Sequence, residues 1–246
     1  MSLPVHLAPS LTGVAPGETV EVTGDEAHHA VAVRRLRVGE TVVLTDGAGT
    51  SVTGPVGSTG KRVFTVRVDD VRREPRPQPE LVVVQALPKG DRGELAVEVL
   101  TEVGVALVVP WAAARSVAVW KGERAERSRA KWQATAREAA KQARRSWLPE
   151  VAALARTAEV VDLVAGADLA LVLHEGADDA LVHVDVPSAG RIVLVVGPEG
   201  GLSEAEVAAL VGAGARSVRL GDEVLRTSTA GVVAAAAVLA RTPRWG

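Results

Sequence analysis

Residues 197–201, Gly-Pro-Glu-Gly-Gly, stand where an apolar run at 191–196 gives way to the start of a helix. A strand, a glycine-rich loop and a helix form the usual layout of a phosphate cradle, in which backbone N–H groups face the ligand. Here Pro198 removes one N–H group, Glu199 adds a negative charge, and no lysine follows as in a Walker loop. The loop therefore favours close backbone contact with a ligand other than phosphate, and the alternative is a tight turn with a solvated glutamate.

A second chemical signal is Arg226, in VLRTSTAG just before an apolar helix. Thr227 and Ser228 are candidate N-caps for that helix, and capping explains their hydroxyls well. It does not explain Arg226, because a cation at a helix N-terminus opposes the helix dipole. We therefore expect Arg226 to have a ligand or an acidic partner.

Histidine and cysteine offer little for a metal site. The chain has no cysteine, which excludes disulfides and thiolate ligands. His28 and His29 have no acid clustered at ligand spacing, and His6 and His183 are isolated, so no metal is expected. His174 differs, because it lies beside Glu175 at the end of a predicted strand.

The elements that would position these loops alternate between strand and helix after residue 80. Residues 81–87 and 105–110 are predicted buried strands, and a helix over 91–104 connects them into a strand–helix–strand unit of a parallel sheet. Further strands are predicted at 167–173, 191–197 and 216–221, with a helix from about Glu204, a capping box of Ser203 and Glu206, and a final alanine-rich helix. In parallel sheets, ligands bind beyond the carboxyl ends of strands. The loops 173–176, 197–201 and 220–230 all lie at such ends.

The first 74 residues predict a separate, β-rich domain. ETVEVTG and ETVVLTDG alternate apolar and polar residues as half-buried strands do, and RVFTVRVDDVRR predicts another strand. DEAHHAVAVRRLR predicts a short helix with Asp25 as its N-cap. Three prolines within 74–80 mark a linker, so we expect domains at 1–74 and 75–246.

Charge is unevenly distributed although the net charge of the 246 residues is only -2. Residues 121–149 contain nine Lys or Arg against three Glu. We expect one long helix over 121–147, ended by Pro149, with one apolar and one basic face. The most apolar tract, 230–240, is shorter than the roughly 20 residues that cross a bilayer, and the N-terminus lacks a signal-peptide pattern. We expect a cytoplasmic protein that does not enter the membrane.

Four stretches, in register along nearly the whole chain, resemble the RsmE family of SPOUT (trefoil-knot) RNA methyltransferases. They are HHAVAVRRLRVGE, PKGDRGELAVEVLTEVGV, KWQATAREAAKQARRSWLPEV, and VVGPEGGLSEAEV followed by LGDEVLRTSTAGVVAAAAV. The family methylates N3 of a uridine in small-subunit (16S) ribosomal RNA with S-adenosyl-L-methionine as methyl donor. The resemblance implies an α/β fold, in which a small N-terminal PUA-like β-barrel precedes a SPOUT domain with a mainly parallel sheet and a trefoil knot. It also implies a homodimer acting on 16S rRNA or the small ribosomal subunit.

The resemblance assigns expected roles to single residues. From the charge pattern we further hypothesise that Arg226 stabilises the charge that develops on the uridine, and that a loop carboxylate, Glu199 in preference to Glu175, orients the substrate or assists its deprotonation. One position departs from the family, which usually has a glutamate where this chain has Ser228. The residues expected to bind the cofactor are Leu173, His174, Glu175, Gly197, Pro198, Glu199, Gly200, Gly201, Leu220, Leu225, Arg226, Thr227 and Thr229. Those expected to bind RNA are Arg34, Arg35, Arg37, Arg137, Lys141, Arg144 and Arg145.

Two other functions remain open at this point. A nucleotide-dependent oxidoreductase or kinase is disfavoured by Pro198, by Glu199 and by the missing lysine. A non-catalytic RNA-binding or ribosome-assembly factor is compatible with the replacement of the family glutamate by Ser228.

Overall fold

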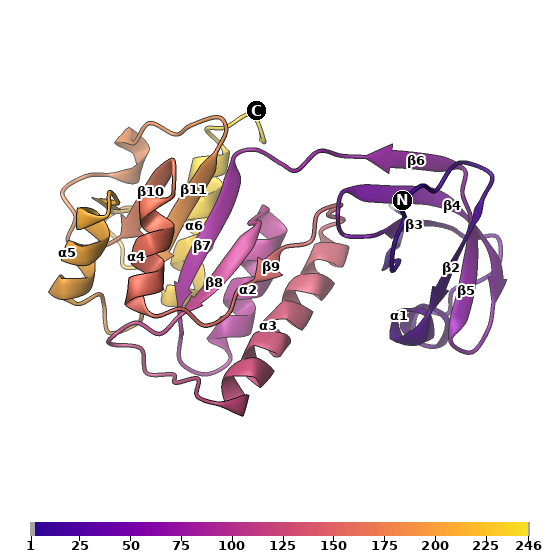
Figure 1. Ribbon diagram of the computed structural model, residues 1–246, viewed down its shortest axis with the longest axis horizontal. Coiled ribbons are helices and arrows are strands. Elements are labelled where there is room, and N and C mark those ends of the chain that lie inside the picture. The colour runs from indigo at the N-terminus through magenta and orange to yellow at the C-terminus, as the bar shows by residue number, and fades with distance from the viewer. Residues whose placement is uncertain (1–2, 246) are drawn as a thin grey trace. The chain divides into compact units, whose positions relative to one another are not determined.

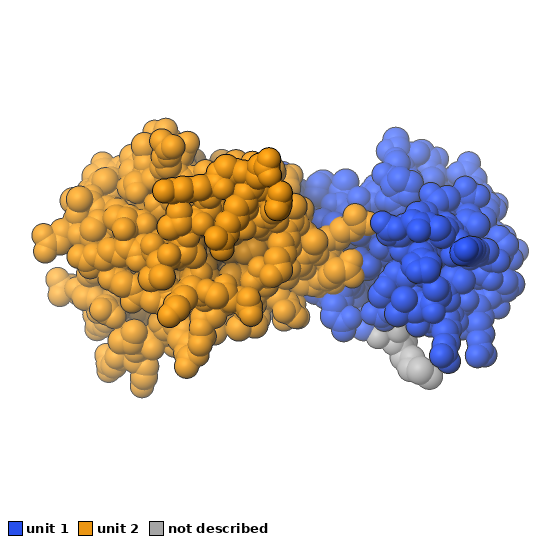
Figure 2. Space-filling view, turned by 90° about the horizontal axis from the view of Figure 1, so that it is seen from below, with its two compact units in different colours: residues 1–76, 140–148 blue, residues 77–139, 149–246 orange. Residues whose placement is uncertain are grey.

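The computed structural model describes residues 3–245, and the chain divides into two compact units (Figure 2). The first unit contains residues 1–76 together with Ala140–Leu148. The second unit contains Pro77–Ala139 and the chain from Pro149 onward. In the described part of the chain, every helix is too short or too polar to cross a lipid bilayer.

The first unit is built on a six-stranded β-sheet with the order β1-β3-β4-β5-β2, in which β6 also pairs with β4. All its pairings are antiparallel except that of β1 with β3. Its core consists of alternate strand residues such as Leu44, Val52 and Phe64, which are buried. The strands are β1 (Val5–Leu7), β2 (Thr19–Thr23), β3 (Thr41–Thr45), β4 (Thr50–Thr59), β5 (Val63–Arg67) and β6 (Asp70–Arg73).

Three local predictions in this unit were wrong. The expected helix is α1 (Gly24–His28) followed by a π-helical segment, and its N-cap is Thr23 rather than Asp25, whose carboxylate pairs with Arg62. The stretch expected as one strand is split into β5 and β6, because β5 pairs with β2 while β6 pairs with β4. The long strand β4 was missed, since its glycines and proline weaken the alternating pattern.

The second unit is an α/β layer structure around a six-stranded sheet with the order β12-β10-β11-β7-β8-β9. Every pairing in this sheet is parallel, as the sequence pattern predicted. The strands are β7 (Glu80–Ala86), β8 (Leu107–Trp111), β9 (Glu150–Val151), β10 (Leu169–Leu173), β11 (Arg191–Val196) and β12 (Arg216–Val218). The helices are α2 (Arg92–Val103), α3 (Glu123–Gln142), α4 (Thr157–Ala165), α5 (Glu204–Gly212) and α6 (Thr227–Leu239) (Figure 1). The short β9 and α4 were not predicted.

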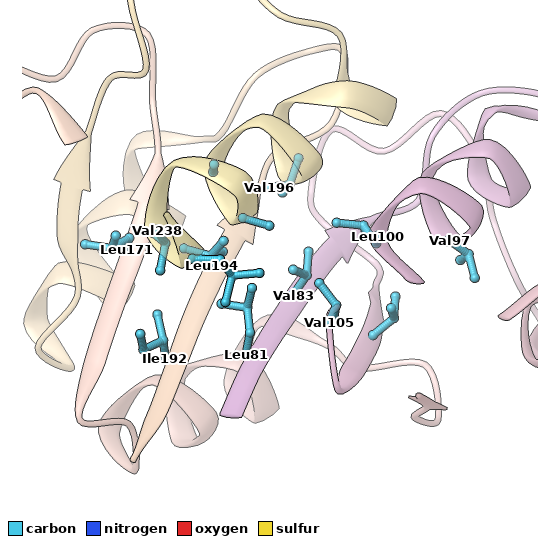
Figure 3. Packing of buried hydrophobic residues seen from close by; sticks show 14 of the residues in the cluster. Leu81, Val83, Val97, Leu100, Val105, Leu171, Ile192, Leu194, Val196 and Val238 are labelled. Atoms are coloured by element: carbon cyan, nitrogen blue, oxygen red, sulfur yellow. The ribbon is translucent and has the colours of Figure 1, made fainter. Parts of the chain in front are cut away.

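Successive residues of each central strand face opposite layers of apolar side chains. In β7, Leu81 and Val83 pack with residues of α2 and α6, whereas Val82 and Val84 pack with residues of α4 and α5. Figure 3 shows the first of these layers. Gly231 lets α6 approach closely, because a Cβ atom there would lie 3.3 Å from the side chains of both Leu100 and Val196. This packing holds the start of α6 against the sheet.

Helix α3 is shorter than expected. It ends at Gln142, and Arg144 adopts a left-handed conformation with φ of 56°. Pro149 therefore does not end the helix as predicted. The reason is that residues 143–148 pack within the first unit. There the Trp147 indole donates to the carbonyl of Glu74, and the Leu148 N–H donates to the carbonyl of Gly47.

Candidate functional site

The carboxyl edge of the parallel sheet contains a cavity of about 880 Å³. The loops after β10, β11 and β12 form most of its wall, and it is lined by both polar and apolar side chains. This is the edge at which the strand pattern placed the ligand site. The volume lies within the range of 300–1,000 Å³ that is typical of small-molecule and cofactor sites.

The residues that were expected to bind a cofactor come together in this cavity. All of them except Thr229 line its wall, and the Thr229 hydroxyl instead donates to the carbonyl of Arg226 at 3.3 Å. The lining residues from the expected set are Leu173, His174, Glu175, Gly197, Pro198, Glu199, Gly200, Gly201, Leu220, Leu225, Arg226 and Thr227.

The Gly-Pro-Glu-Gly-Gly loop is held from two sides. The Glu199 carboxylate accepts a hydrogen bond from the backbone N–H of Lys89 at 3.1 Å. The Arg115 guanidinium donates to the carbonyls of Gly200 and Leu202 at 3.2 and 3.3 Å. A Cβ atom at Gly200 would lie 3.3 Å from the carbonyl oxygen of Arg115, and Gly201 has a φ of 72°. Both glycines are therefore needed for the path of the loop.

The predicted capping box at the start of α5 is confirmed. The Ser203 hydroxyl accepts from the Glu206 N–H, and the Glu206 carboxylate accepts from the Ser203 N–H at 2.9 Å. The same carboxylate accepts from the Ala114 N–H at 2.7 Å, and Glu206 is only 4% exposed. Burial alone would raise the pKa of Glu206, but the hydrogen bonds from Ala114 and Ser203 and the charge of Arg115 outweigh it and lower the pKa. Glu206 thus ties the loop after β8 to the loop after β11.

Arg226 is the N-cap of α6, rather than Thr227 or Ser228 as expected, and its side chain makes no capping hydrogen bond. Its guanidinium is exposed in the cavity wall and forms no ion pair with a carboxylate of the described residues. Thr227 and Ser228 are the first two residues of the helix, and both are buried. The Thr227 carbonyl accepts a hydrogen bond from the buried side-chain amide of Gln85 at 3.2 Å. The Ser228 hydroxyl has no hydrogen-bond partner among residues 3–245. An unpaired cation therefore faces the cavity at the positive end of a helix.

Several charged residues of the wall were missed at the sequence level. Arg92 and Arg115 follow β7 and β8, so the rule that pointed to the other strand ends also covers them. Arg219 donates to the carbonyls of Ala177 and Asp178 and so holds the loop after β10. Asp222 and Glu223 lie within the predicted loop 220–230, although they were not named among the residues expected to bind the cofactor.

The residues expected to bind RNA fall in both units. Arg34, Arg35, Arg37 and Arg144 are exposed in the first unit, where Arg145 is partly buried, and Arg137 is exposed in the second. Lys141 differs, since its side chain is only 10% exposed and its Nζ lies 3.0 Å from a Glu26 carboxylate oxygen. Across the described residues, His, Asp and Glu form no group of three or more that could hold a metal ion.

Comparison with known proteins shows the family to which the chain belongs. The family model for an RNA methyltransferase domain matches residues 74–239, and the model for an RNA methyltransferase PUA domain matches residues 22–69. The chain is 45% identical to the ribosomal RNA small subunit methyltransferase E of Mycobacterium bovis, covering 93% of this chain and 89% of that protein. It is 31% identical to the protein of the same name from Bacillus subtilis, covering 91% of both.

Among solved structures, the fold is similar to that of a ribosomal RNA small subunit methyltransferase E from Neisseria gonorrhoeae, which was crystallised with S-adenosyl methionine. The TM-score is 0.84 at 27% identity, and the match covers 97% of both chains. The expected combination of a mainly parallel α/β domain and an N-terminal PUA-like domain is therefore confirmed. The family model covers most of the chain and the identity extends over nearly all of it, so the chain belongs to the ribosomal RNA small subunit methyltransferase E family.

Proposed function

We propose that this protein is an S-adenosylmethionine-dependent methyltransferase that modifies N3 of a uridine in 16S ribosomal RNA. The observation that carries the proposal is the cavity at the sheet edge, which combines a glycine-rich loop with an unpaired arginine at the start of α6. The names of the relatives support ribosomal RNA as the substrate. The choice of uridine N3 rests on the resemblance to the family.

The cavity fits S-adenosylmethionine better than a dinucleotide. Pro198 lacks the backbone N–H group that would bind a pyrophosphate at this loop. Glu199 adds a negative charge that would repel one. The wall carries four acidic side chains and four arginines, which suits S-adenosylmethionine because that ligand has positive groups and a carboxylate. When bound, S-adenosylmethionine supplies an electrophilic methyl group on its sulfonium centre.

Arg226 and Glu199 are the residues to which we assign the chemistry. Methylation of N3 requires loss of the N3 proton, and negative charge then spreads onto the ring oxygens. The unpaired Arg226 guanidinium is available to stabilise that charge. One oxygen of the Glu199 carboxylate is held by the Lys89 N–H, so the other is free to orient the uracil or to accept its proton.

We assign residues 1–74 to an RNA-binding domain and 75–246 to the methyltransferase domain. Arg34, Arg35, Arg37, Arg137, Arg144 and Arg145 would hold the RNA backbone, mainly through its phosphates. On the basis of the family resemblance we also propose a trefoil knot, a homodimer and a cytoplasmic location. Leu95 on α2 and Val233 on α6 are exposed apolar residues on two helices that pack together, and light scattering would test the proposed dimer.

The test is single-turnover methylation of 16S rRNA with saturating S-adenosylmethionine. Removal of one electrostatic contact to the transition state typically lowers the rate by 10²–10³, so we expect Arg226→Ala to lose at least about 100-fold even when S-adenosylmethionine is saturating. The control is Arg216→Ala, because Arg216 pairs with Asp179 on the surface and does not line the cavity. A near-normal rate for Arg226→Ala would refute its role.

Mass spectrometry of 16S rRNA nucleosides from a strain lacking the gene tests the function itself. We expect loss of 3-methyluridine and its return on complementation. If the protein binds the RNA but the modification is unaltered, it is a non-catalytic RNA-binding or assembly factor instead.

A further inference from the structure

A second cavity, of about 290 Å³, lies in the methyltransferase unit beside the cofactor cavity. Its floor contains the edge-to-face pair of Trp120 and Trp132, whose ring centroids are 4.9 Å apart. Trp132 is buried against Gly93, where a Cβ atom would lie 2.6 Å from the indole, whereas Trp120 is only partly buried. Trp120 is therefore the aromatic surface that a ligand could reach.

The charged side chains that line this cavity, Asp91, Glu94, Arg124 and Lys131, sum to zero. Lys131 pairs with Glu94 at 2.9 Å, and Asp91 and Ser128 also line the wall. Asp91 is the N-cap of α2, but its carboxylate makes no capping hydrogen bond and stays available as an acceptor. A planar uncharged ring with N–H donors fits such a cavity better than a phosphate does. Nucleobases are rings of this kind, and proteins commonly stack them on aromatic side chains.

A cation stands at the rim of the cavity. Arg124 is exposed and forms no ion pair with the described residues, unlike its neighbour Arg127, which pairs with Glu123 at 2.8 Å. An unpaired guanidinium beside an aromatic cavity suits the phosphate that accompanies a base.

One loop contributes neighbouring residues to the linings of both cavities. Pro88, Gly90 and Asp91 line the second cavity, while Arg92, next in the chain, lines the first. Lys89, within the same loop, donates its N–H to Glu199 of the cofactor site. The loop 88–92 therefore borders both cavities, so when the target base of an RNA strand enters the first cavity, a base close to it could enter the second.

We propose that the cavity beneath Trp120 binds a nucleobase of the substrate strand next to the target uridine, with Arg124 contacting its phosphate. This proposal deepens the proposed function and rests on it for the RNA substrate. The base would stack on Trp120, and Asp91 would accept from its N–H donors.

The experiment measures binding of a single-stranded fragment of 16S rRNA and of S-adenosylmethionine to the full-length protein. Stacking of one base typically changes affinity by about 5- to 100-fold. We expect Trp120→Leu, which keeps apolar bulk in the core, to weaken RNA binding by about tenfold, and Trp120→Phe to restore most of it. Arg124→Gln should weaken RNA binding and reduce its salt dependence, whereas the matched control Arg127→Gln should not.

The affinity for S-adenosylmethionine and the melting temperature of each variant separate a binding role from a structural one. The proposal predicts that Trp120→Leu keeps both close to wild type and raises KM for RNA more than it lowers kcat. Wild-type RNA affinity in a folded Trp120→Leu variant would overturn it, and so would an equal loss in Trp120→Phe and Trp120→Leu. If the wild type binds the RNA but does not methylate it, the proposed function fails while the binding test of this cavity stands.

Discussion

Lys141→Met is the most informative single change outside the cofactor cavity. In the first unit, Lys141 Nζ and His6 Nδ1 lie 3.0 and 3.4 Å from the two carboxylate oxygens of Glu26, and all three side chains are nearly buried. Burial alone would raise the pKa of Glu26, but the nearby His6, the hydrogen bond and charge of Lys141, and the hydrogen bond from the Leu7 N–H lower it to about 2. Lys141 was expected to bind RNA, so the variant separates two roles for one side chain.

The expected loss of folding stability follows from the lowered pKa of Glu26. Lowering the pKa from 4.5 to about 2 corresponds to about 3 kcal/mol of folding stability at 1.36 kcal/mol for each pKa unit. Removing one partner of a buried ion pair typically costs 3–5 kcal/mol, because the other charge stays buried without compensation. We therefore expect Lys141→Met to lower the free energy of unfolding of the first unit by about 3 kcal/mol at pH 7.

The stabilising effect of Glu26 should decrease as the pH falls. Because the pKa of Glu26 is lower in the folded protein, its stabilising effect is complete above about pH 4.5 and is lost as the pH falls toward 2. The stability difference between wild type and Lys141→Met should thus be constant near neutral pH and should shrink in acid. Replacing both residues, as in Glu26→Gln with Lys141→Met, should recover part of the loss because no unpaired charge remains.

The assay is urea-dependent hydrogen exchange, followed by mass spectrometry in peptides from residues 19–31 and 140–148. Lys131→Met is the control, because Lys131 also lies on α3 but belongs to the second unit and its side chain is 64% exposed, so no change in these first-unit peptides is expected. Unchanged exchange in Lys141→Met would refute the reasoning. If that variant were fully stable and bound RNA less tightly, Lys141 would be an RNA contact as first expected.

Three further predictions concern the site and its support. Glu206→Ala should destabilise the second unit by about 2–4 kcal/mol, because the hydrogen bonds from Ala114 and Ser203 to a buried carboxylate are lost together. An unaltered midpoint of urea unfolding would contradict this expected loss of stability. Gly231→Val should cost about 1–3 kcal/mol by overpacking α6 against Leu100 and Val196, with a smaller effect for Gly231→Ala, as thermal melts would show. Affinity for 16S rRNA should fall with salt, and Arg35→Gln should reduce the slope of log K against log salt by about 1; equal slopes would exclude Arg35 as a phosphate contact.

The strands of the parallel sheet and the loops at their carboxyl ends were predictable, because each depends on a local pattern. The continuous apolar run of β7 and the glycines and proline after β11 encode their conformations within a few residues. The same local reasoning placed most of the cavity wall. The rule for strand ends also covers Arg115, but its hydrogen bonds to the carbonyls of Gly200 and Leu202 could not be predicted, because these residues lie 85 and 87 positions away in the chain.

The sequence by itself predicted which loops line the cavity and that their chemistry disfavours phosphate, since proline geometry and side-chain charge are properties of single residues. Only the tertiary structure decided which cations are free for function. Lys141 and Arg226 look alike as basic residues in the sequence, yet Lys141 meets Glu26 from 115 residues away and becomes buried, while Arg226 faces a cavity without an acidic partner among the described residues. Burial and pairing depend on contacts between distant segments, and these form only when the chain has folded.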